Sequence, residues 1–283
     1  MTNPMLLKFM RNQALPLRLR KKVGKFIGSP QSGIRFKIKV FDALFEGETG
    51  SHQDDKIFYY GAHEPATLRL MRDIMEYQAT QGMDPVYLDI GTNIGQHLIA
   101  VASKARYAYG FEPWSKVRDE ALKNLALNDY AHVQVLPFGL SDVSAQLPYF
   151  PPVKKNLGCG SFMPEAENVG KPITLEVRKG DDVVNELGIK PTLLKIDTEG
   201  FEQYVLRGLA QTIAVQKPAV VFELGDLSRK DFGSLEDLYK YFPREYSFHG
   251  ILRSCEKPHL EKYNPEHKYE NLLAWPSQEF KLY

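Results

Sequence analysis

The chain has 283 residues, of which 43% are hydrophobic and 25% charged, the balance of a globular protein with room for one large domain. No stretch approaches the roughly 18 uninterrupted apolar residues that span a bilayer, so no transmembrane segment is expected. Cys159 and Cys255 form neither a metal-ligand spacing nor a disulfide framework, and the N-terminus is a poor secretion signal. A cytoplasmic location is therefore expected.

Charge is distributed unevenly along the chain. The net charge is +1, but ten Lys and Arg residues and no acidic residue precede Asp42, and 26 basic and 35 acidic side chains make up the rest. A basic arm on an acidic body predicts an anionic partner, such as membrane headgroups, a nucleic acid or an acidic glycan. Apolar residues at helical spacing from Leu19 to Ile27 would suit a peripheral membrane contact, and the alternative is a solvated tail that caps the core. We assign residues 1–56 to this arm and extension and 57–283 to the main domain.

The first elements predicted along the chain are short. Residues 34–47 begin with the alternation of a half-exposed strand, and residues 56–61 are predicted to form another short strand. Pro65 then opens a helix with apolar residues on one face, which ends at Gly82.

From residue 86 onward, strands alternate with helices. Strands are predicted at 86–90, 107–112, 133–142, 192–197, 219–224, 245–251 and 270–275, and helices at 94–104, 114–128, 201–215 and 234–242. A less regular insertion has probable strand pattern at 146–151 and 173–177. This order indicates an α/β fold with a doubly wound, mostly parallel sheet. Its ligand crevice is expected outside the carboxyl ends of the central strands.

The stretch "VYLDIGTNIGQHL" (86–98) is a strand, a glycine turn and the start of a helix. Gly91 and Gly95 let the backbone turn tightly and a ligand approach closely, but the spacing is shorter than the G-x-G-x-x-G pattern of dinucleotide folds. Asp89 would repel a pyrophosphate and attract a cationic ligand such as S-adenosylmethionine, which carries a sulfonium and an ammonium group. The alternative is that Asp89 only caps the helix or braces the turn.

Acidic residues also follow the next two strands. Glu112 lies 23 residues after Asp89, where an acidic residue binds the ribose hydroxyls of an adenine nucleotide. Asp142, beside Ser141, would accept a hydrogen bond from the exocyclic amine of adenine, or would serve as a turn or N-cap residue.

The stretch "LLKIDTEGFE" (193–202) places charged residues in an apolar strand. By strand alternation Lys195 and Asp197 face the same side, where they would neutralise each other. Glu199 follows in the turn, and Glu223 ends the adjacent strand. One of these carboxylates would take the proton from a substrate hydroxyl as it attacks a methyl group. The alternatives are a helix N-terminus with an ion pair, or a divalent cation site, although we predict no metal.

The chain resembles the FkbM family of S-adenosylmethionine-dependent methyltransferases. The resemblance covers about residues 57–225 and rests on "HEPAT" (63–67), "LDIGTNIG" (88–95), "GFEP" (110–113), "LSD" (140–142), "LKIDTEGFEQYVLRG" (194–208) and "VVFEL" (220–224). It implies a Rossmann-like methyltransferase fold that methylates a hydroxyl oxygen, often on a sugar or a natural product.

The resemblance also implies roles for individual residues. Asp89, Gly91, Asn93 and Gly95 would surround the methionine part of the cofactor, and Asp197 would lie near the transferred methyl. Glu112 would bind the ribose, Ser141 and Asp142 the adenine side, and Glu64 would also face the cofactor. Thr92 departs from the alanine common in the family.

We therefore predict an S-adenosylmethionine-dependent O-methyltransferase, with Asp197, Glu199 and Glu223 as catalytic residues. Its acceptor would be a hydroxyl of a glycan, a lipid-linked saccharide or a natural product, with no nucleic acid as partner because the body is acidic. The alternatives are a nicotinamide-dependent oxidoreductase and a non-catalytic binding protein with a basic arm.

Overall fold

The computed structural model describes residues 33–152, 160–164, 170–252 and 258–280, together with Met5, Phe9, Leu19 and Leu282. Most of the basic arm lies outside the described residues, so its expected membrane contact stays a prediction. No helix in the described part of the chain is both long and apolar enough to cross a membrane.

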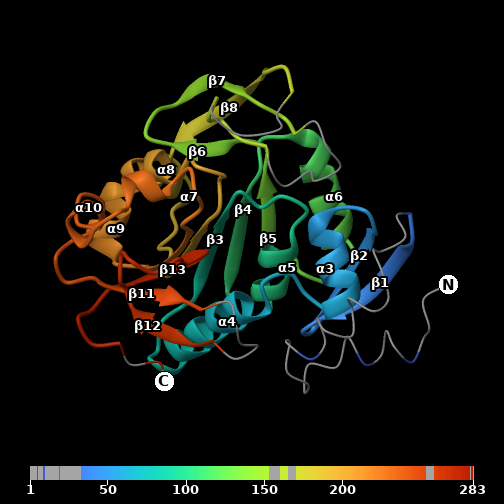
Figure 1. The fold of residues 1–283 in the computed structure, drawn as a ribbon, viewed down its shortest axis with the longest axis horizontal. Coiled ribbons are helices and arrows are strands. Elements are labelled where there is room, and N and C mark those ends of the chain that lie inside the picture. The colour runs from blue at the N-terminus through green and yellow to red at the C-terminus, as the bar shows by residue number, and fades with distance from the viewer. Residues whose placement is uncertain are drawn as a thin grey trace.

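The described residues form a central eight-stranded sheet with the order β12-β11-β13-β10-β9-β3-β4-β5 (Figure 1). Its parallel strands are β3 (Val86–Ile90), β4 (Tyr107–Phe111), β5 (Val133–Leu136), β9 (Leu193–Ile196) and β10 (Ala219–Glu223). β13 (Asn271–Trp275) pairs antiparallel with β10, and β11 (Ser247–Ile251) and β12 (Leu260–Lys262) complete that edge. From β3 the chain builds the sheet outward through β4 and β5 on one side and through β9 and β10 on the other. The crevice expected of a doubly wound sheet therefore lies between β3 and β9.

Helices cover both faces of this sheet. One face carries α3 (His52–Tyr60), α4 (Pro65–Thr80), α5 (Gln96–Ala102) and α6 (Ser115–Leu125), and the other carries α7 (Gly180–Leu187), α8 (Glu202–Gly208), α9 (Ala210–Gln216) and α10 (Leu235–Leu238). Strand alternation explains the two cores, because Leu88 packs in the core of α7 to α9 whereas Tyr87 packs in the core of α4 and α5. The predicted doubly wound, mostly parallel sheet is confirmed.

A small three-stranded sheet stands above the central strands at the top of Figure 1. It consists of β6 (Gly139–Ser141), β8 (Ile173–Lys179) and β7 (Ala145–Tyr149). β7 and β8 come from the predicted insertion, whereas β6 is the end of the strand predicted at 133–142, which the structure divides between β5 and this sheet. This sheet supplies one wall of the cavity described below.

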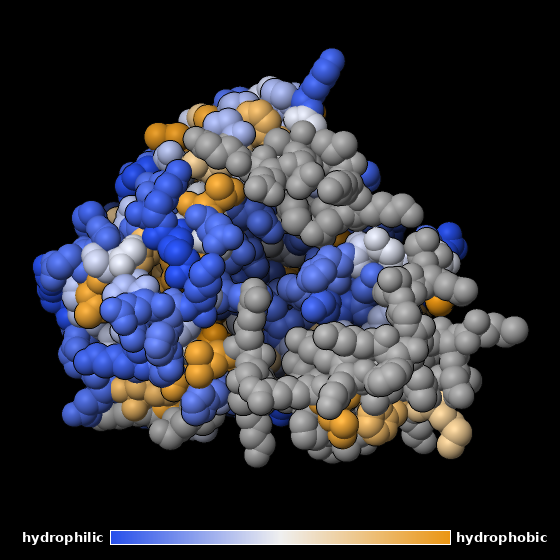
Figure 2. Space-filling model, in the orientation of Figure 1, coloured by the Kyte–Doolittle hydropathy of each residue, from blue (hydrophilic) through white to orange (hydrophobic). Residues whose placement is uncertain are grey.

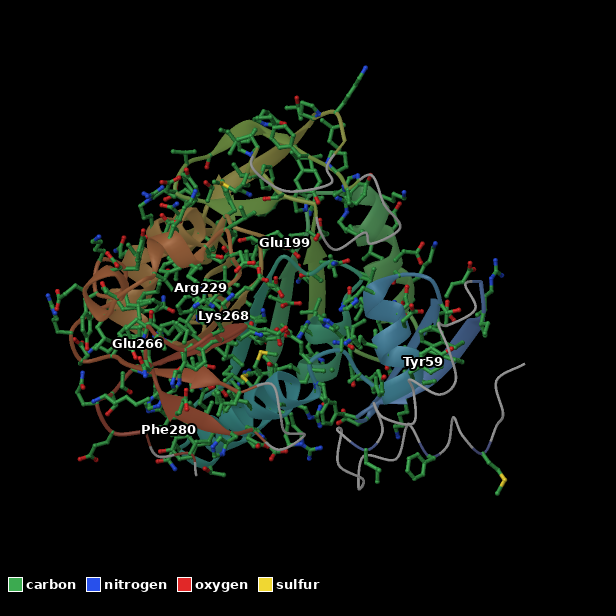
Figure 3. The ribbon with its side chains drawn as sticks, in the orientation of Figure 1. Tyr59, Glu199, Arg229, Glu266, Lys268 and Phe280 are labelled. Atoms are coloured by element: carbon green, nitrogen blue, oxygen red, sulfur yellow. The ribbon has the colours of Figure 1, made fainter. Side chains whose placement is uncertain are left out.

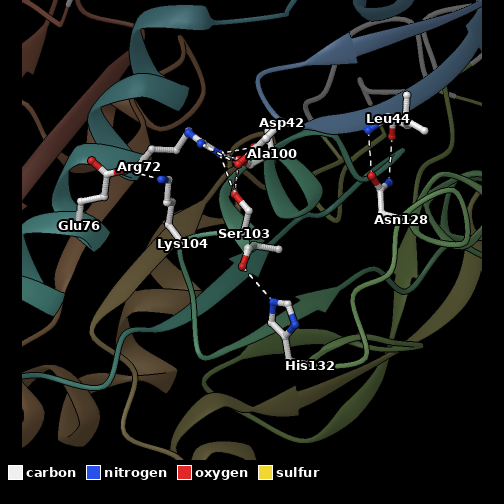
Figure 4. A network of polar contacts seen from close by, with 10 residues as sticks. Asp42, Leu44, Arg72, Glu76, Ala100, Ser103, Lys104, Asn128 and His132 are labelled. Carbon is white, nitrogen blue, oxygen red and sulfur yellow. Dashed lines mark hydrogen bonds and ion pairs between the residues drawn. The ribbon is translucent and has the colours of Figure 1, made fainter.

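A hairpin of β1 (Arg35–Val40) and β2 (Ala43–Glu48) is attached to the main domain by polar contacts (Figure 4). Arg72 of α4 donates to both carboxylate oxygens of Asp42 at 2.8 and 3.1 Å, and also to the carbonyl of Ala100. Burial acts to raise the pKa of Asp42, but the hydrogen bonds from Arg72 and Ser103 outweigh it and lower that pKa. The hairpin is therefore fixed to α4 and α5.

Several elements differ from the sequence expectations. Residues 56–60 belong to α3, a helix whose first turn is capped by Ser51, and Gly61 is its C-cap, so no strand forms there. The predicted boundary between residues 56 and 57 consequently lies inside this helix. α7 was not predicted, and the helix predicted at 201–215 is divided into α8 and α9 at Leu209.

Candidate functional site

A cavity opens at the carboxyl ends of β3, β4 and β9, beneath the small sheet, with about 1020 Å³ of open volume. Figure 3 shows Glu199 there, between the small sheet and the central strands. On the face shown in Figure 2 the described surface is mainly hydrophilic, with apolar residues in small separate groups, so the cavity is the more distinctive feature. Its lining includes His52, His63, Gly91, Asn93, His97, Phe111, Glu112, Leu140, Tyr149, Phe162, Asp197, Thr198, Glu199 and Phe201.

The glycine turn is shaped mainly by contacts within the protein. Gly91 has φ 84°, and a Cβ at this position would lie 1.8 Å from the carbonyl oxygen of Asp197. Gly95 has φ 88°, and its Cβ would crowd Ala121 of α6. Only Gly91 of the two lines the cavity. Gly95 therefore leaves room for α6, whereas Gly91 leaves room for β9 and also lines the cavity, so close approach of a ligand to Gly91 stays a prediction.

Asp89 lies beneath the cavity and is not part of its lining. Its carboxylate is buried, with Oδ1 accepting from the hydroxyl of Tyr87 at 2.9 Å. Asp89 pairs in register with Lys195, two residue pairs below the level of Gly91, which explains its depth. Burial raises the pKa of Asp89. The structure thus does not bring Asp89 to the cavity wall, where the sequence reasoning placed it.

Glu112 lines the cavity, and its two carboxylate oxygens accept hydrogen bonds from the turns that follow β3 and β4. Oε2 accepts from the backbone N–H of Asn93 and Oε1 from that of Trp114, both at 2.9 Å. Burial raises the pKa of Glu112 to about 7. Each oxygen keeps a free lone pair, since a carboxylate accepts about four hydrogen bonds. The group is therefore placed to accept from a hydroxyl in the cavity.

Ser141 and Asp142 do not line the cavity. Asp142 accepts from Arg207 Nε of α8 at 2.9 Å, and Ser141 is buried at the end of β6. The preceding residues Gly139 and Leu140 reach the lining instead. The reason is that β6 pairs with β8 rather than with the main sheet, which turns its end away from the cavity.

The turn after β9 holds two acidic side chains in the cavity wall. Lys195 is completely buried, and its Nζ lies 3.0 Å from Asp197 Oδ2, so the predicted ion pair is confirmed. Glu199 has φ 53°, a left-handed conformation that the surroundings must impose. Ser161 Oγ donates to the Glu199 carbonyl at 2.7 Å, and Glu202 accepts from the N–H of Thr198 at 2.8 Å. These contacts fix the turn.

Asp197, Glu199 and Glu223 come together as predicted, with one carboxylate oxygen of each within 4.8 Å of the others. Burial, followed by the charge of Asp197, raises the pKa of Glu199 to about 8 and that of Glu223 well above its ordinary value. With no ligand bound, Glu199 and Glu223 are therefore mostly protonated at neutral pH. Asp197, paired with Lys195, lines the cavity beside Glu199.

Glu64, at the start of α4, faces a second cavity adjacent to the first. It lies 3.4 Å from His97 Nε2 and accepts from Asn271 Nδ2 at 3.0 Å. Burial acts to raise the pKa of Glu64, but the bond from His97 outweighs it and holds that pKa well below its usual value. His63 lines both cavities and joins them.

Several lining residues were missed by sequence reasoning. His63 precedes Glu64 in "HEPAT", and Gln96 holds its backbone by accepting from the N–H at 2.6 Å and donating to the carbonyl at 3.0 Å. Burial lowers the pKa of His63 to about 4, so its imidazole is neutral. Its position next to Glu64 in the sequence could have indicated that it belongs to the site. The aromatic wall of Tyr149 and Phe162 comes from the irregular insertion, whose position no local pattern revealed.

Comparison with known proteins shows which proteins the chain is similar to. A family model described as "Methyltransferase FkbM domain" matches residues 89–251, more than half of the chain. The hexuronic acid methyltransferase AglP of Haloferax volcanii is 31% identical over 134 residues, covering 46% of this chain and 52% of that protein. The methyltransferase sdnD of Sordaria araneosa is 28% identical over 195 residues, covering 55% of this chain and 73% of that protein.

A solved structure supports the fold. The crystal structure of an S-adenosylmethionine-dependent methyltransferase from Agrobacterium tumefaciens aligns with a TM-score of 0.51 at 9% identity, covering 89% of this chain and 73% of that one. At this identity the likeness concerns the fold alone, and it agrees with the Rossmann-like methyltransferase architecture. The match to AglP spans about half of that relative's length.

Proposed function

Because the chain belongs to the FkbM methyltransferase family, we propose that it binds S-adenosylmethionine in the cavity and methylates a hydroxyl oxygen. The observation that carries the proposal is the position of Glu112. Its buried carboxylate ends β4 and faces the cavity beside the β3–α5 glycine turn, where ribose hydroxyls would donate to it. The aromatic residues Tyr149 and Phe162 offer an apolar wall for the adenine ring.

When bound, S-adenosylmethionine supplies a methyl group on a positively charged sulfur. The acceptor oxygen would bond to the methyl carbon as the carbon–sulfur bond breaks with its electron pair on sulfur, and the hydroxyl would lose its proton. Asp197 lines the cavity and is assigned as the group that receives this proton. Lys195 Nζ donates to Asp197 Oδ2 at 3.0 Å and so fixes the orientation of this carboxylate. The fixed turn around Glu199 aligns the acceptor with the methyl group.

We assign the acceptor to the sugars. The support is the similarity to a relative named as a hexuronic acid methyltransferase, together with the polar second cavity lined by His52, Lys56, Glu64 and Asn271. A hydride-transferring oxidoreductase is disfavoured, because the family is one of methyltransferases and the third glycine of the dinucleotide pattern is missing. Contact of the basic arm with an anionic membrane stays a separate proposal, which liposome co-sedimentation of the full-length chain tests.

The experiment is an acceptor screen with tritiated methyl donor and a panel of hexuronic acids, neutral hexoses and their glycosides. We expect label in an alkali-stable methyl ether of a sugar, and a fall of at least tenfold in kcat for Asp197→Asn with little change in cofactor affinity. Asp182→Asn, which changes an exposed carboxylate of α7, is the matched control and should keep full activity. Label in an alkali-labile ester, or an unchanged kcat for Asp197→Asn, would contradict the proposed reaction or the role of Asp197, respectively.

A further inference from the structure

Three adjacent strands of the central sheet end in a row of oxygen-bearing side chains. Asn271 of β13 pairs directly with Glu223 of β10. Phe222 pairs with Ile196 of β9, so the next residues, Glu223 and Asp197, lie side by side. All three side chains project from the sheet face that carries α4 and α5, because residues at alternate positions share a face. Glu199, in the turn after Asp197, completes the cluster.

The carboxylates of this cluster are spaced for a common cation. One oxygen from each of Asp197, Glu199 and Glu223 lies within 4.8 Å of the other two. Oxygens on a Ca²⁺ at about 2.3–2.6 Å stand up to about 5 Å apart, and those on the smaller Mg²⁺ stand closer. The spacing is therefore compatible with a common divalent cation after a small contraction of the cluster, larger for Mg²⁺ than for Ca²⁺. All three donors are hard oxygens, which favour Mg²⁺, Mn²⁺ and Ca²⁺ over Zn²⁺.

The charges of the cluster are not balanced within the protein. Lys195 is the buried cation beside it, and it is bound to Asp197. If all three carboxylates are ionised, as cation ligands are, the single ammonium leaves two negative charges in a half-buried place, which is costly without a partner. One divalent cation would neutralise them.

Asn271 provides an independent indication of a ligand. Its side chain is 2% exposed, and its Nδ2 donates to Glu64, but its Oδ1 has no hydrogen-bond partner in the described part of the chain. An amide oxygen buried without a partner is costly. It stands beside Glu223, since directly opposed residues of an antiparallel pair have Cβ atoms about 4.5–5.5 Å apart. An amide oxygen is also a ligand that hard divalent cations accept.

We propose that Asp197, Glu199 and Glu223, with the amide oxygen of Asn271 at their edge, bind one divalent cation of the Mg²⁺, Mn²⁺ and Ca²⁺ class. This proposal replaces the sequence-based expectation of no metal. Its significance rests on the proposed methyl transfer, because the site lies at the strand ends beside the cofactor cavity. A cation there would bind an acceptor through two neighbouring oxygens, such as a hydroxyl and a carboxylate, and would make the hydroxyl more acidic.

The test is a titration of full-length protein with Mn²⁺ in the presence and absence of S-adenosylhomocysteine, followed by the electron paramagnetic resonance signal of free Mn²⁺. We expect one bound Mn²⁺ per chain, displaced by Mg²⁺ or Ca²⁺, and at least tenfold weaker binding in Glu223→Gln and in Glu199→Gln. Glu236→Gln removes an exposed carboxylate of α10 that pairs with Arg244, and should bind Mn²⁺ as the wild type does.

Thermal unfolding separates loss of the site from misfolding. In EDTA, Glu223→Gln should unfold close to the wild-type temperature, because the side chain that it replaces is already mostly neutral there at pH 7. Mn²⁺ should raise the unfolding temperature of the wild type and not that of Glu223→Gln. Absence of Mn²⁺ binding at millimolar concentration, or equal binding by both variants, would overturn the proposal. Binding of S-adenosylhomocysteine in EDTA is measured separately, so failure of the cation site and failure of the proposed cofactor site are distinguishable.

Discussion

Single residues decide how closely the strand ends approach one another around the cavity. Gly91 leaves room for the carbonyl of Asp197, which brings β3 and β9 together at the point where the ligand would bind. Lys195 neutralises Asp197 from below, and Ser161 holds Glu199 in its left-handed conformation from above. The site is therefore preorganised by backbone contacts as much as by its charged side chains.

Gly91→Ala should be strongly destabilising. The left-handed backbone costs about 1–2 kcal/mol for a residue with a Cβ, and the clash with Asp197 should bring the total to about 3 kcal/mol or more. Gly82→Ala is the matched control, since Gly82 has φ 75° but an added Cβ would meet nothing within 4 Å. Urea unfolding measures both variants. Equal losses of free energy of unfolding would show that β3 and β9 do not approach as described.

Ionisation of Glu112 should control the pH dependence of cofactor binding. Its pKa is raised from 4.5 to about 7, so the folded state holds this proton more tightly than the unfolded state does. The free energy of unfolding therefore falls as pH rises from about 4.5 to about 7. Ribose hydroxyls donate to the ionised form, so affinity for S-adenosylhomocysteine should increase as pH rises through about 7 and level off above it. Calorimetry from pH 5.5 to 8.5 measures this, and Glu112→Gln should abolish that increase. An identical increase in the variant would assign it to another group.

Some of these residue-level features could be predicted from the sequence, and others could not. The pairing of Lys195 with Asp197 follows from strand alternation, and the convergence with Glu223 from the parallel order of β9 and β10. The position of Asp142 did not follow, because its strand joins the small sheet. Asn271 was also missed. It lies 48 residues after Glu223 in the chain, and no local sequence pattern shows that β13 pairs with β10.

At the scale of elements, the β1–β2 hairpin and α3 enclose the side of the domain that carries α4 and α5. The wrong strand prediction for 56–61 arose from its run of β-favouring aromatic residues. A helix-start signal was present just before it, because Ser51 caps the N–H of Asp54, the spacing of a capping box. Elements with strong periodicity, such as α4, were predicted to within a residue or two because one buried face determines them.

Arg72→Ala should loosen the hairpin. Arg72 is mostly buried and binds Asp42 and the carbonyl of Ala100, so its loss should cost about 2 kcal/mol of unfolding free energy. Arg106→Ala is the control, because Arg106 makes an Arg–Asp contact of the same 2.8 Å length on the exposed surface and should change stability little. Hydrogen exchange should be faster in β1 and β2 of Arg72→Ala than in the wild type. Unchanged exchange would contradict the attachment shown in Figure 4.

At the scale of the whole molecule, one doubly wound sheet brings its functional groups to a single edge. The fold was predictable because alternating strands and helices allow few topologies, and right-handed crossovers select among them. The small sheet over the cavity was not, because the insertion that forms it lacks a clear period. In the proposed function that insertion and the second cavity would bind the acceptor, and neither could be placed from a local pattern, so the sequence indicated the reaction more clearly than the substrate.

The most direct measurement is a calorimetric titration of the full-length protein with S-adenosylhomocysteine, with NADH as the parallel ligand. We predict one site of micromolar affinity for the first ligand, no binding of the second, and at least tenfold weaker binding in Glu112→Ala. Glu186→Ala, an exposed carboxylate of α7 that pairs with Arg178, is the control and should bind as the wild type does. Binding of NADH alone, or wild-type affinity in Glu112→Ala, would contradict the assignment of the cavity to S-adenosylmethionine.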